Sequence, residues 1–169
     1  MQSIRAVAAQ QLYWVQPKML ILKFELRAGN DLLGTFHWRG HSRSALTTAE
    51  LADATLTFQR KGIFRPRVVI GGGPDDVVFT HRWNGDGTLT FPDGRVLTWD
   101  FLDFAYRGHT WKTANGTRLI GYRTTSGFLK NGGQITIEPS ASSLPDLTFL
   151  VAFGCYLTIK AHSIPNNSD

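Results

Sequence analysis

The residues best suited to binding chemistry form one basic stretch, Arg60-Lys61-Gly62-Ile63-Phe64-Arg65-Pro66-Arg67. Four cations surround two large apolar side chains, and Ile63 and Phe64 fall at the expected tip of a hairpin. Such a tip can contact an anionic bilayer, where each Lys or Arg contributes about 1 kcal/mol, or it can bind nucleic-acid phosphates. Strand alternation places Arg65 and Arg67 on one face, and a solvated turn with Phe64 folded inward is the structural alternative. The candidate anion- or lipid-binding residues are Arg60, Lys61, Phe64, Arg65 and Arg67.

The histidines and the cysteine do not indicate a metal centre or a nucleophile. His37 and His41 are four residues apart, but His37 falls at the end of an expected strand, and no metal-binding motif surrounds the pair. Cys155 lies in an apolar segment, where burial raises the pKa of a thiol and makes it unreactive. We therefore expect no bound metal, no cofactor and no cysteine chemistry.

Acidic and glycine-rich segments give only weak indications of catalysis. Asp75 with Asp76, and Asp100 with Asp103, have spacings that fit the carboxylate pair of a glycosidase, and loop solvation explains them equally well. The run 71–74, Gly-Gly-Gly-Pro, lacks the Lys-Ser/Thr ending of a phosphate-binding loop and predicts a turn. The segment 84–87, Asn-Gly-Asp-Gly, lacks the remaining ligands of a calcium loop. We expect no catalytic residue.

Composition indicates a folded domain spanning residues 1–169, because 42% of the residues are hydrophobic and 18% are charged. The net charge of +5 is concentrated in residues 1–70, which hold ten Lys and Arg against four Asp and Glu. An anionic partner fits this half, although solvated strand faces explain it too. The single cysteine excludes an internal disulfide and favours a cytoplasmic location. Neither a signal-peptide layout nor an apolar run long enough for a transmembrane segment is present.

Short β-type runs separated by turn residues dominate the chain. The turns Asp93-Gly94 and Asn115-Gly116 are strong hairpin signals, because both pairs favour positive φ angles. About ten to twelve short strands with no intervening helical pattern predict an antiparallel sandwich or barrel. The expected strands are Met19–Arg27, Leu32–Trp38, Ser44–Thr48, Thr55–Arg60, Arg65–Ile70, Val77–Trp83, Thr88–Phe91, Arg95–Trp99, Phe104–Lys112, Thr117–Thr124 and Gln134–Glu138.

One segment near the C-terminus breaks this pattern and predicts a helix over residues 144–161. Leu147–Ile159 is apolar on every side of a helical wheel, so the helix must be buried on all sides. Ser143 and Asp146 resemble a capping box with Pro145 in the first turn. At about 22 Å the helix is short for a bilayer but fits the lumen of a closed sheet. A fully buried pair of strands is the alternative.

The hairpin chain from Leu20 to Glu138, followed by Leu144-Pro145-Asp146-Leu147 to Ile159, resembles the tubby C-terminal-like barrel superfamily. That superfamily includes tubby proteins, phospholipid scramblases and LURP-one-related proteins. The resemblance implies a closed antiparallel β-barrel around a buried C-terminal helix. It also implies phosphoinositide binding or action at membranes, although the scramblase cysteine-rich segment and membrane tail are not seen here.

These observations favour a non-enzymatic binding or scaffold domain, peripheral to a membrane, that binds anionic lipid headgroups through the basic hairpin. We expect no specific nucleic-acid binding, and the sequence does not indicate an oligomeric state. A small-ligand carrier of the lipocalin type is the first alternative, and an open apolar pocket in the barrel would favour it. A hydrolase that uses the loop carboxylates is the second alternative.

Overall fold

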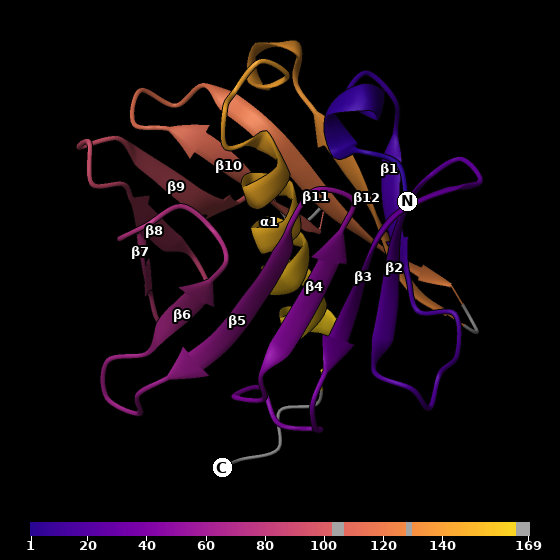
Figure 1. Cartoon of the computed structure of the whole chain (residues 1–169). Coiled ribbons are helices and arrows are strands. Elements are labelled where there is room, and N and C mark those ends of the chain that lie inside the picture. Colours follow the sequence, from indigo (N-terminus) through magenta and orange to yellow (C-terminus); the bar gives the residue numbers. More distant parts are fainter. Residues whose placement is uncertain (103–106, 128–129, 165–169) are drawn as a thin grey trace.

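The chain folds into a closed antiparallel β-barrel around one central helix (Figure 1). The computed structural model describes residues 1–102, 107–127 and 130–164. Within these residues twelve strands follow one another around the barrel in chain order, and β1 closes the ring by pairing with β12. The barrel and its threaded helix confirm the predicted fold class.

The strands are short, and each one pairs antiparallel with its neighbours in the sequence. Their bounds are β1 Leu12–Val15, β2 Lys23–Ala28, β3 Asp31–Trp38, β4 Thr47–Leu51, β5 Thr55–Lys61, β6 Arg67–Gly71, β7 Val78–His81, β8 Gly87–Thr90, β9 Val96–Phe101, β10 Gly108–Thr113, β11 Arg118–Gly127 and β12 Lys130–Ile137. Two short 3-10 helices, η1 (Ile4–Val7) and η2 (Pro139–Ala141), lie outside the ring of strands.

Alternation of apolar and polar residues explains why these segments form strands of a barrel. In β2 the buried residues Phe24, Leu26 and Ala28 alternate with partly exposed ones, so one face points into the lumen. The predicted hairpin turns are confirmed, because Gly94 and Gly116 both have a φ of +88°.

The strand predictions were wrong at several boundaries. Residues 19–22 lie in the β1–β2 loop rather than in a strand, and β1 was not predicted. Their sequence Met-Leu-Ile-Leu is apolar without alternation, and three of its four side chains are exposed. The expected strand Phe104–Lys112 begins in residues outside the described part of the chain; the structure places β10 at Gly108–Thr113.

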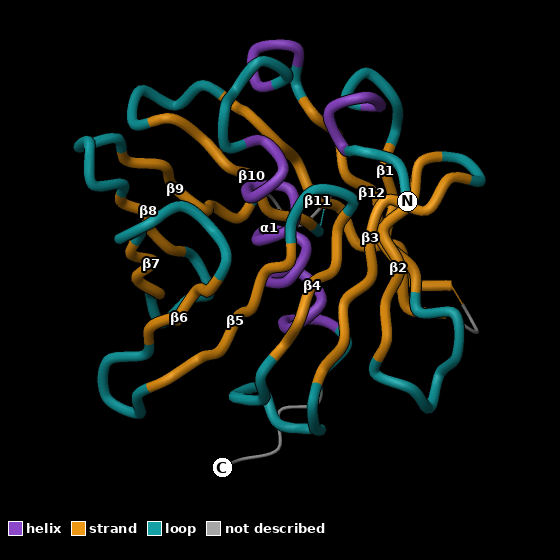
Figure 2. The backbone as a smooth tube through the Cα atoms, viewed as in Figure 1, coloured by secondary structure: helices purple, strands orange, loops and turns teal. Residues whose placement is uncertain are grey.

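The predicted C-terminal helix is α1 (Leu147–His162), and it runs through the middle of the barrel (Figure 2). The expected capping box is wrong: the N-cap is Asp146, and its side chain makes no capping hydrogen bond. The Asp146 carboxylate instead accepts a hydrogen bond of 2.9 Å from Arg95 on the β8–β9 turn. The Asp146 side chain therefore ties the start of α1 to the β8–β9 turn and does not cap the helix.

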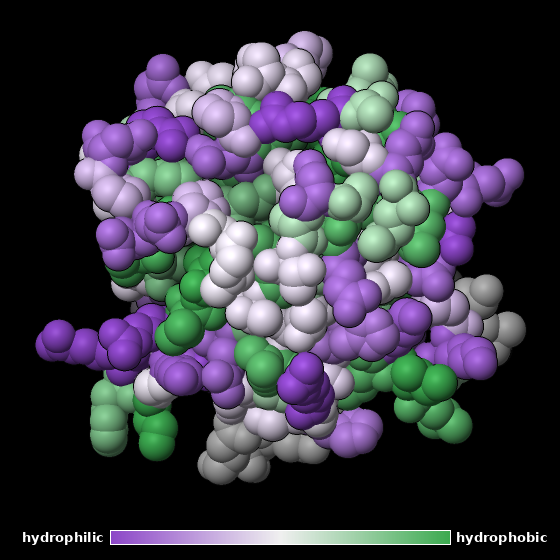
Figure 3. Space-filling view, viewed as in Figure 1, coloured by the Kyte–Doolittle hydropathy of each residue, from purple (hydrophilic) through white to green (hydrophobic). Residues whose placement is uncertain are grey.

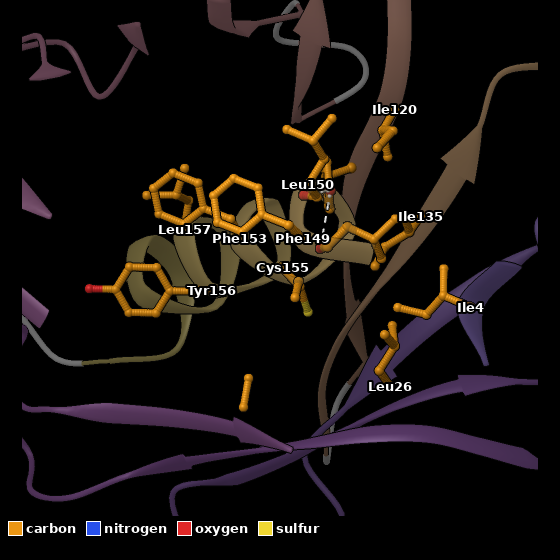
Figure 4. Close-up of a cluster of buried hydrophobic side chains, with 14 of the residues drawn as sticks. Ile4, Leu26, Ile120, Ile135, Phe149, Leu150, Phe153, Cys155, Tyr156 and Leu157 are labelled. Carbon is orange, nitrogen blue, oxygen red and sulfur yellow. Dashed lines mark hydrogen bonds between the residues drawn. The ribbon is translucent and has the colours of Figure 1, made fainter. Parts of the chain in front are cut away.

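Side chains on every side of α1 form the core of the molecule (Figure 4). Phe153 and Leu157 leave the helix on one side and Cys155 on another, yet all three are buried. The Phe153 ring lies 5.3 Å from that of Phe58 on β5 and 5.0 Å from that of Phe79 on β7. The helix thus fills the lumen where a carrier protein would hold its ligand.

Antiparallel order gives the barrel two distinct ends. The connections that follow odd-numbered strands lie at one end, which we call the loop end, and those that follow even-numbered strands lie at the other, the cap end. Helix α1 begins at the cap end and finishes at the loop end (Figure 1). The basic hairpin β5–β6 therefore lies at the same end as Lys160 and His162.

Candidate functional site

The predicted basic hairpin forms as expected, but its five candidate residues do not share one surface. Phe64 is 97% exposed at the tip, so the inward-folded alternative is wrong for this side chain. Arg65 is in the turn and not on a strand, which corrects its predicted place beside Arg67. Its neighbour Pro66 has no N–H, and this explains why the strand pairing begins only at Arg67.

The β5–β6 hairpin separates the other three cations onto two faces. Leu56 and Phe58 are buried in the lumen, so alternation directs Arg60 inward and Lys61 outward. Lys61 lies directly opposite Arg67 across the hairpin. Two like charges in that position destabilise a hairpin by up to about 1 kcal/mol. Among the described residues, neither Lys61 nor Arg67 forms an ion pair with an acidic side chain, and a bound anion would relieve the repulsion.

Large apolar side chains project from three loops at the loop end. The exposed fractions are 65% for Met19 and 94% for Leu20 in the β1–β2 loop, 88% for Ile63 and 97% for Phe64 in the β5–β6 turn, and 100% for Trp83 in the β7–β8 turn. Figure 3 shows hydrophobic side chains projecting beside hydrophilic ones over the β1–β2 loop and the β5–β6 turn. Exposed side chains of this size gathered at one end indicate a contact surface.

Charge is also unequal between the two ends. The loop-end connections carry mostly cations: Lys18, Arg39, Arg43, Arg65, Arg82 and Arg107, against Asp86 among their described residues. The cap-end connections carry mostly acids: Asp53, Asp75, Asp76, Asp93, Glu138 and Asp146. Two cap-end arginines are also paired, because Arg95 binds Asp93 and Asp146, and Arg5 donates to the carbonyls of Leu144 and Pro145.

A cavity of about 370 Å³ opens at the loop end where α1 finishes. Its lining comes from the last turn of α1, the inner faces of β5, β7, β9 and β10, and two loops. Cationic and imidazole side chains predominate among these residues: Arg43, Arg60, His81, Arg82, His109, Lys160 and His162. No described acid lines the cavity, and Trp83, Asn84 and Trp99 complete its polar and aromatic walls.

Lys160 is the most constrained cation in this cavity. It is 8% exposed, and its Nζ lies 3.3 Å from Nε2 of His81 and 5.7 Å from the centre of the Tyr156 ring. Burial, followed by the nearby charges of Arg60 and Arg43, lowers the pKa of Lys160 to about 7. Arg43 meanwhile donates to the carbonyls of Ala161 and Ile164, which holds it against the end of α1.

The histidines of the cavity are held in their neutral form. Burial and the charges of Lys160 and Arg60 lower the pKa of His81 to about 3, so its ring accepts from the Lys160 ammonium. Burial also lowers the pKa of His109, while the carboxylate of Asp86 opposes that shift from 3.8 Å. At neutral pH the positive charge of the cavity therefore resides on its arginines and, in part, on Lys160.

Sequence reasoning found Arg60 but missed the cavity that it enters. His81 and Lys160 were not proposed as site residues, although Phe79-x-His81 and Phe58-x-Arg60 both place a polar residue two positions after a buried aromatic one. That spacing indicates an inward-facing polar side chain near a strand end. It does not reveal that both strands direct these side chains to the end of α1.

The other sequence candidates have structural explanations. Cys155 is fully buried in α1, which raises the pKa of its thiol. Asp75 and Asp76 lie exposed at the cap end, and Asp103 lies outside the described residues. Asn84 and Asp86 hydrogen-bond each other within the β7–β8 turn. No group of three or more His, Cys, Asp or Glu among the described residues is arranged to hold a metal ion.

Comparisons of the chain with models of protein families, with curated proteins and with solved structures found no match. The resemblance to tubby-like barrels stays a prediction. Among the described residues, no helix has both the length and the apolar character needed to cross a membrane.

Proposed function

We propose that this protein is a non-enzymatic binding domain whose loop end docks on anionic bilayers. The observation that carries the proposal is the meeting of exposed apolar tips and predominantly cationic loops at one end of the barrel. Apolar side chains that enter the acyl boundary gain about 1.5–3 kcal/mol each when fully buried. Basic side chains near an anionic surface add about 1 kcal/mol each.

The aliphatic character of the tips favours a bilayer over nucleic acid. Leu20 and Ile63 have no ring to stack on bases, whereas both can insert between lipid chains. The filled lumen likewise favours surface docking over a lipocalin-type carrier, because α1 occupies the space that an internal apolar ligand would need. The remaining cavity is cationic and opens toward the proposed docking surface.

The proposal is tested by co-sedimentation with phosphatidylcholine vesicles that contain or lack phosphatidylserine. We expect binding only to the anionic vesicles.

The double substitution Lys61→Gln with Arg67→Gln should weaken binding about tenfold to thirtyfold, since two basic contacts are lost. It should not lower the melting temperature, because it removes a like-charge pair. Replacing both Ile63 and Phe64 with Ser should weaken binding while the salt dependence persists.

The matched control is Arg118→Gln, which removes one exposed cation at the cap end. We expect vesicle binding to be unchanged in this variant. If Arg118→Gln weakens binding as much as the single substitution Lys61→Gln does, the attraction is due to net charge alone and the proposed docking surface is wrong. Absence of binding by the unmodified protein to any anionic vesicle would also overturn the proposal.

A further inference from the structure

We propose that the cavity between the end of α1 and strands β5, β7, β9 and β10 binds a phosphomonoester group through Arg60, Lys160 and His81. This site differs from the loop tips, since its cations face the lumen and not the bilayer. It could bind a ligand free in solution whether or not the loop end docks on lipid.

Bringing these cations together costs free energy. Arg60 and Lys160 converge on one partly enclosed space, and no described carboxylate lines it. The guanidinium of Arg60 makes no hydrogen bond or ion pair to any described residue. The side chain of Lys160 is 8% exposed, and its hydrogen-bond partner is the neutral ring of His81. In the absence of an anion, the charge of the lysine is therefore poorly compensated. Such an arrangement destabilises the fold and is explained by a ligand that supplies negative charge.

The charge of the cavity and its number of donors indicate which kind of anion fits. A carboxylate supplies one charge and two oxygens, whereas a phosphomonoester carries about 1.5–2 negative charges and three acceptor oxygens. The guanidinium of Arg60, the ammonium of Lys160 and the side chains of His81 and Asn84 provide several donors for such a group. The dianion would neutralise the positive charges of Arg60 and Lys160 together.

The volume and the walls of the cavity indicate what the rest of the ligand is. The cavity volume of about 370 Å³ exceeds what a phosphate group alone requires and lies at the small end of ligand pockets, ~300–1,000 Å³. Trp99 forms part of the wall and the fully exposed Trp83 part of the rim. These rings provide an apolar surface for an organic substituent on the phosphate. The class of ligand is therefore a small organic phosphomonoester or a lipid headgroup that ends in one.

Isothermal titration calorimetry with glycerol 3-phosphate, at constant ionic strength, tests the site without any membrane. We expect saturable binding of one ligand per chain, and no saturable binding of glycerol or acetate. Arg60→Gln should weaken binding by about tenfold or more, the loss typical of one charge-assisted hydrogen bond. Lys61→Gln is the matched control, because this neighbouring cation faces outward and its removal should change affinity less than about twofold.

Lys160→Met provides a second variant that preserves the packing of the stem and should also weaken binding. No saturable binding of glycerol 3-phosphate to the unmodified protein overturns the proposal, as does an equal loss of affinity in Arg60→Gln and Lys61→Gln. Because these measurements use free ligand, failure of the bilayer proposal would leave them unaffected. Failure of the calorimetry would likewise leave the vesicle result standing.

Vesicles distinguish the two sources of the phosphomonoester. Phosphatidic acid ends in a phosphomonoester, whereas phosphatidylglycerol is an anionic phosphodiester. If the ligand is a lipid headgroup, Arg60→Gln weakens binding to phosphatidic acid vesicles more than to phosphatidylglycerol vesicles, and glycerol 3-phosphate competes only with the former. If the ligand is a free metabolite, Arg60→Gln lowers the affinity for glycerol 3-phosphate in calorimetry, and it does not weaken binding to phosphatidic acid vesicles more than binding to phosphatidylglycerol vesicles.

Discussion

Lys160 couples the stability of this protein to its proposed ligand chemistry. Its ammonium is buried beside Arg60 and Arg43, and these surroundings lower its pKa from the usual 10.5 to about 7. In the unfolded chain the same side chain keeps its proton up to about pH 10. Folding therefore opposes protonation of Lys160, and an anion in the cavity would remove that opposition.

We expect the free energy of unfolding to rise as pH increases from 7 to about 8.5. In this window the unfolded chain holds a proton on Lys160 that the folded chain has released, and stability then rises with pH by up to about 1.4 kcal/mol per unit. Below pH 7 both states are protonated, so the full penalty applies. Urea unfolding at several pH values measures this slope, and Lys160→Met should abolish it.

The difference between the unmodified protein and Lys160→Met isolates this effect from other titrations. Burial raises the pKa of the Tyr156 hydroxyl and that of the Cys155 thiol, so both groups reduce stability only at higher pH. His81, with its pKa lowered to about 3, reduces stability only as pH falls below about 6.5. If Lys160→Met is less stable than the unmodified protein at pH 6, Lys160 is not a buried, uncompensated charge.

At the scale of elements, α1 functions as the core on which the barrel closes. Its carbonyls at Leu150 and Val151 accept hydrogen bonds from the Tyr122 hydroxyl of β11, and the Trp111 indole of β10 also donates to Leu150. These bonds fix the depth of the helix in the lumen. Rigid strands on all sides then prevent the core from collapsing around a shortened side chain.

Phe153→Ala should lower the free energy of unfolding by about 3–5 kcal/mol, since the lost ring packs against aromatic rings from several strands. Val151 and Cys155, on the opposite side of α1, should also be sensitive to truncation, because no side of the helix between Leu147 and Lys160 is exposed. Chemical denaturation of these variants is the measurement. One tolerant stripe of positions would indicate instead that α1 leaves the lumen in solution.

Gly154 provides a sharper test of the close fit between α1 and β11. A methyl group at this position would overlap the Tyr122 ring, which its hydrogen bonds hold in place. Alanine favours a helix over glycine by about 1 kcal/mol, yet we expect Gly154→Ala to lower the melting temperature because overpacking costs about 1–3 kcal/mol. The control is Gly121→Ala on β11, where the added methyl meets no atom within 4 Å. A stabilised Gly154→Ala variant would contradict the packing described here.

The whole molecule is polar along its axis, with cations and apolar tips at the loop end and carboxylates at the cap end. On an anionic surface this polarity favours one orientation, because the cap end is repelled. The barrel should therefore stand with α1 finishing toward the bilayer. The fully exposed Trp83 would then lie at the interface, where tryptophan is commonly enriched.

This orientation can be measured with a fluorophore sensitive to polarity. Because Cys155 is buried, Leu20→Cys and Asn115→Cys each create one accessible thiol, the first at the loop end and the second at the cap end. We expect a blue shift on adding phosphatidylserine vesicles only with the label at position 20. Equal responses at the two positions would show that the barrel does not bind through one end.

The sequence by itself determined the ring of hairpins and the helix that fills it. Asp93-Gly94 and Asn115-Gly116 specify turns locally, and alternation within each strand assigns one face to the interior. A segment apolar on every side, Leu147–Ile159, can be stable only if a closed wall surrounds it. Residues 19–22 were wrongly predicted to form a strand, because strand and loop differ there in burial and not in residue type.

Only the tertiary structure decided what the loop end contains. Sequence placed Arg60 in one basic hairpin with Lys61, Arg65 and Arg67, but in the structure Arg60 faces the lumen, on the same side of β5 as Leu56 and Phe58. Closure also brought His81 and Lys160 into the cavity that Arg60 lines, although about 80 residues separate the two in the chain. Local patterns fix which face of a strand a side chain occupies. The partners that it meets across the lumen depend on the register and curvature of the complete ring.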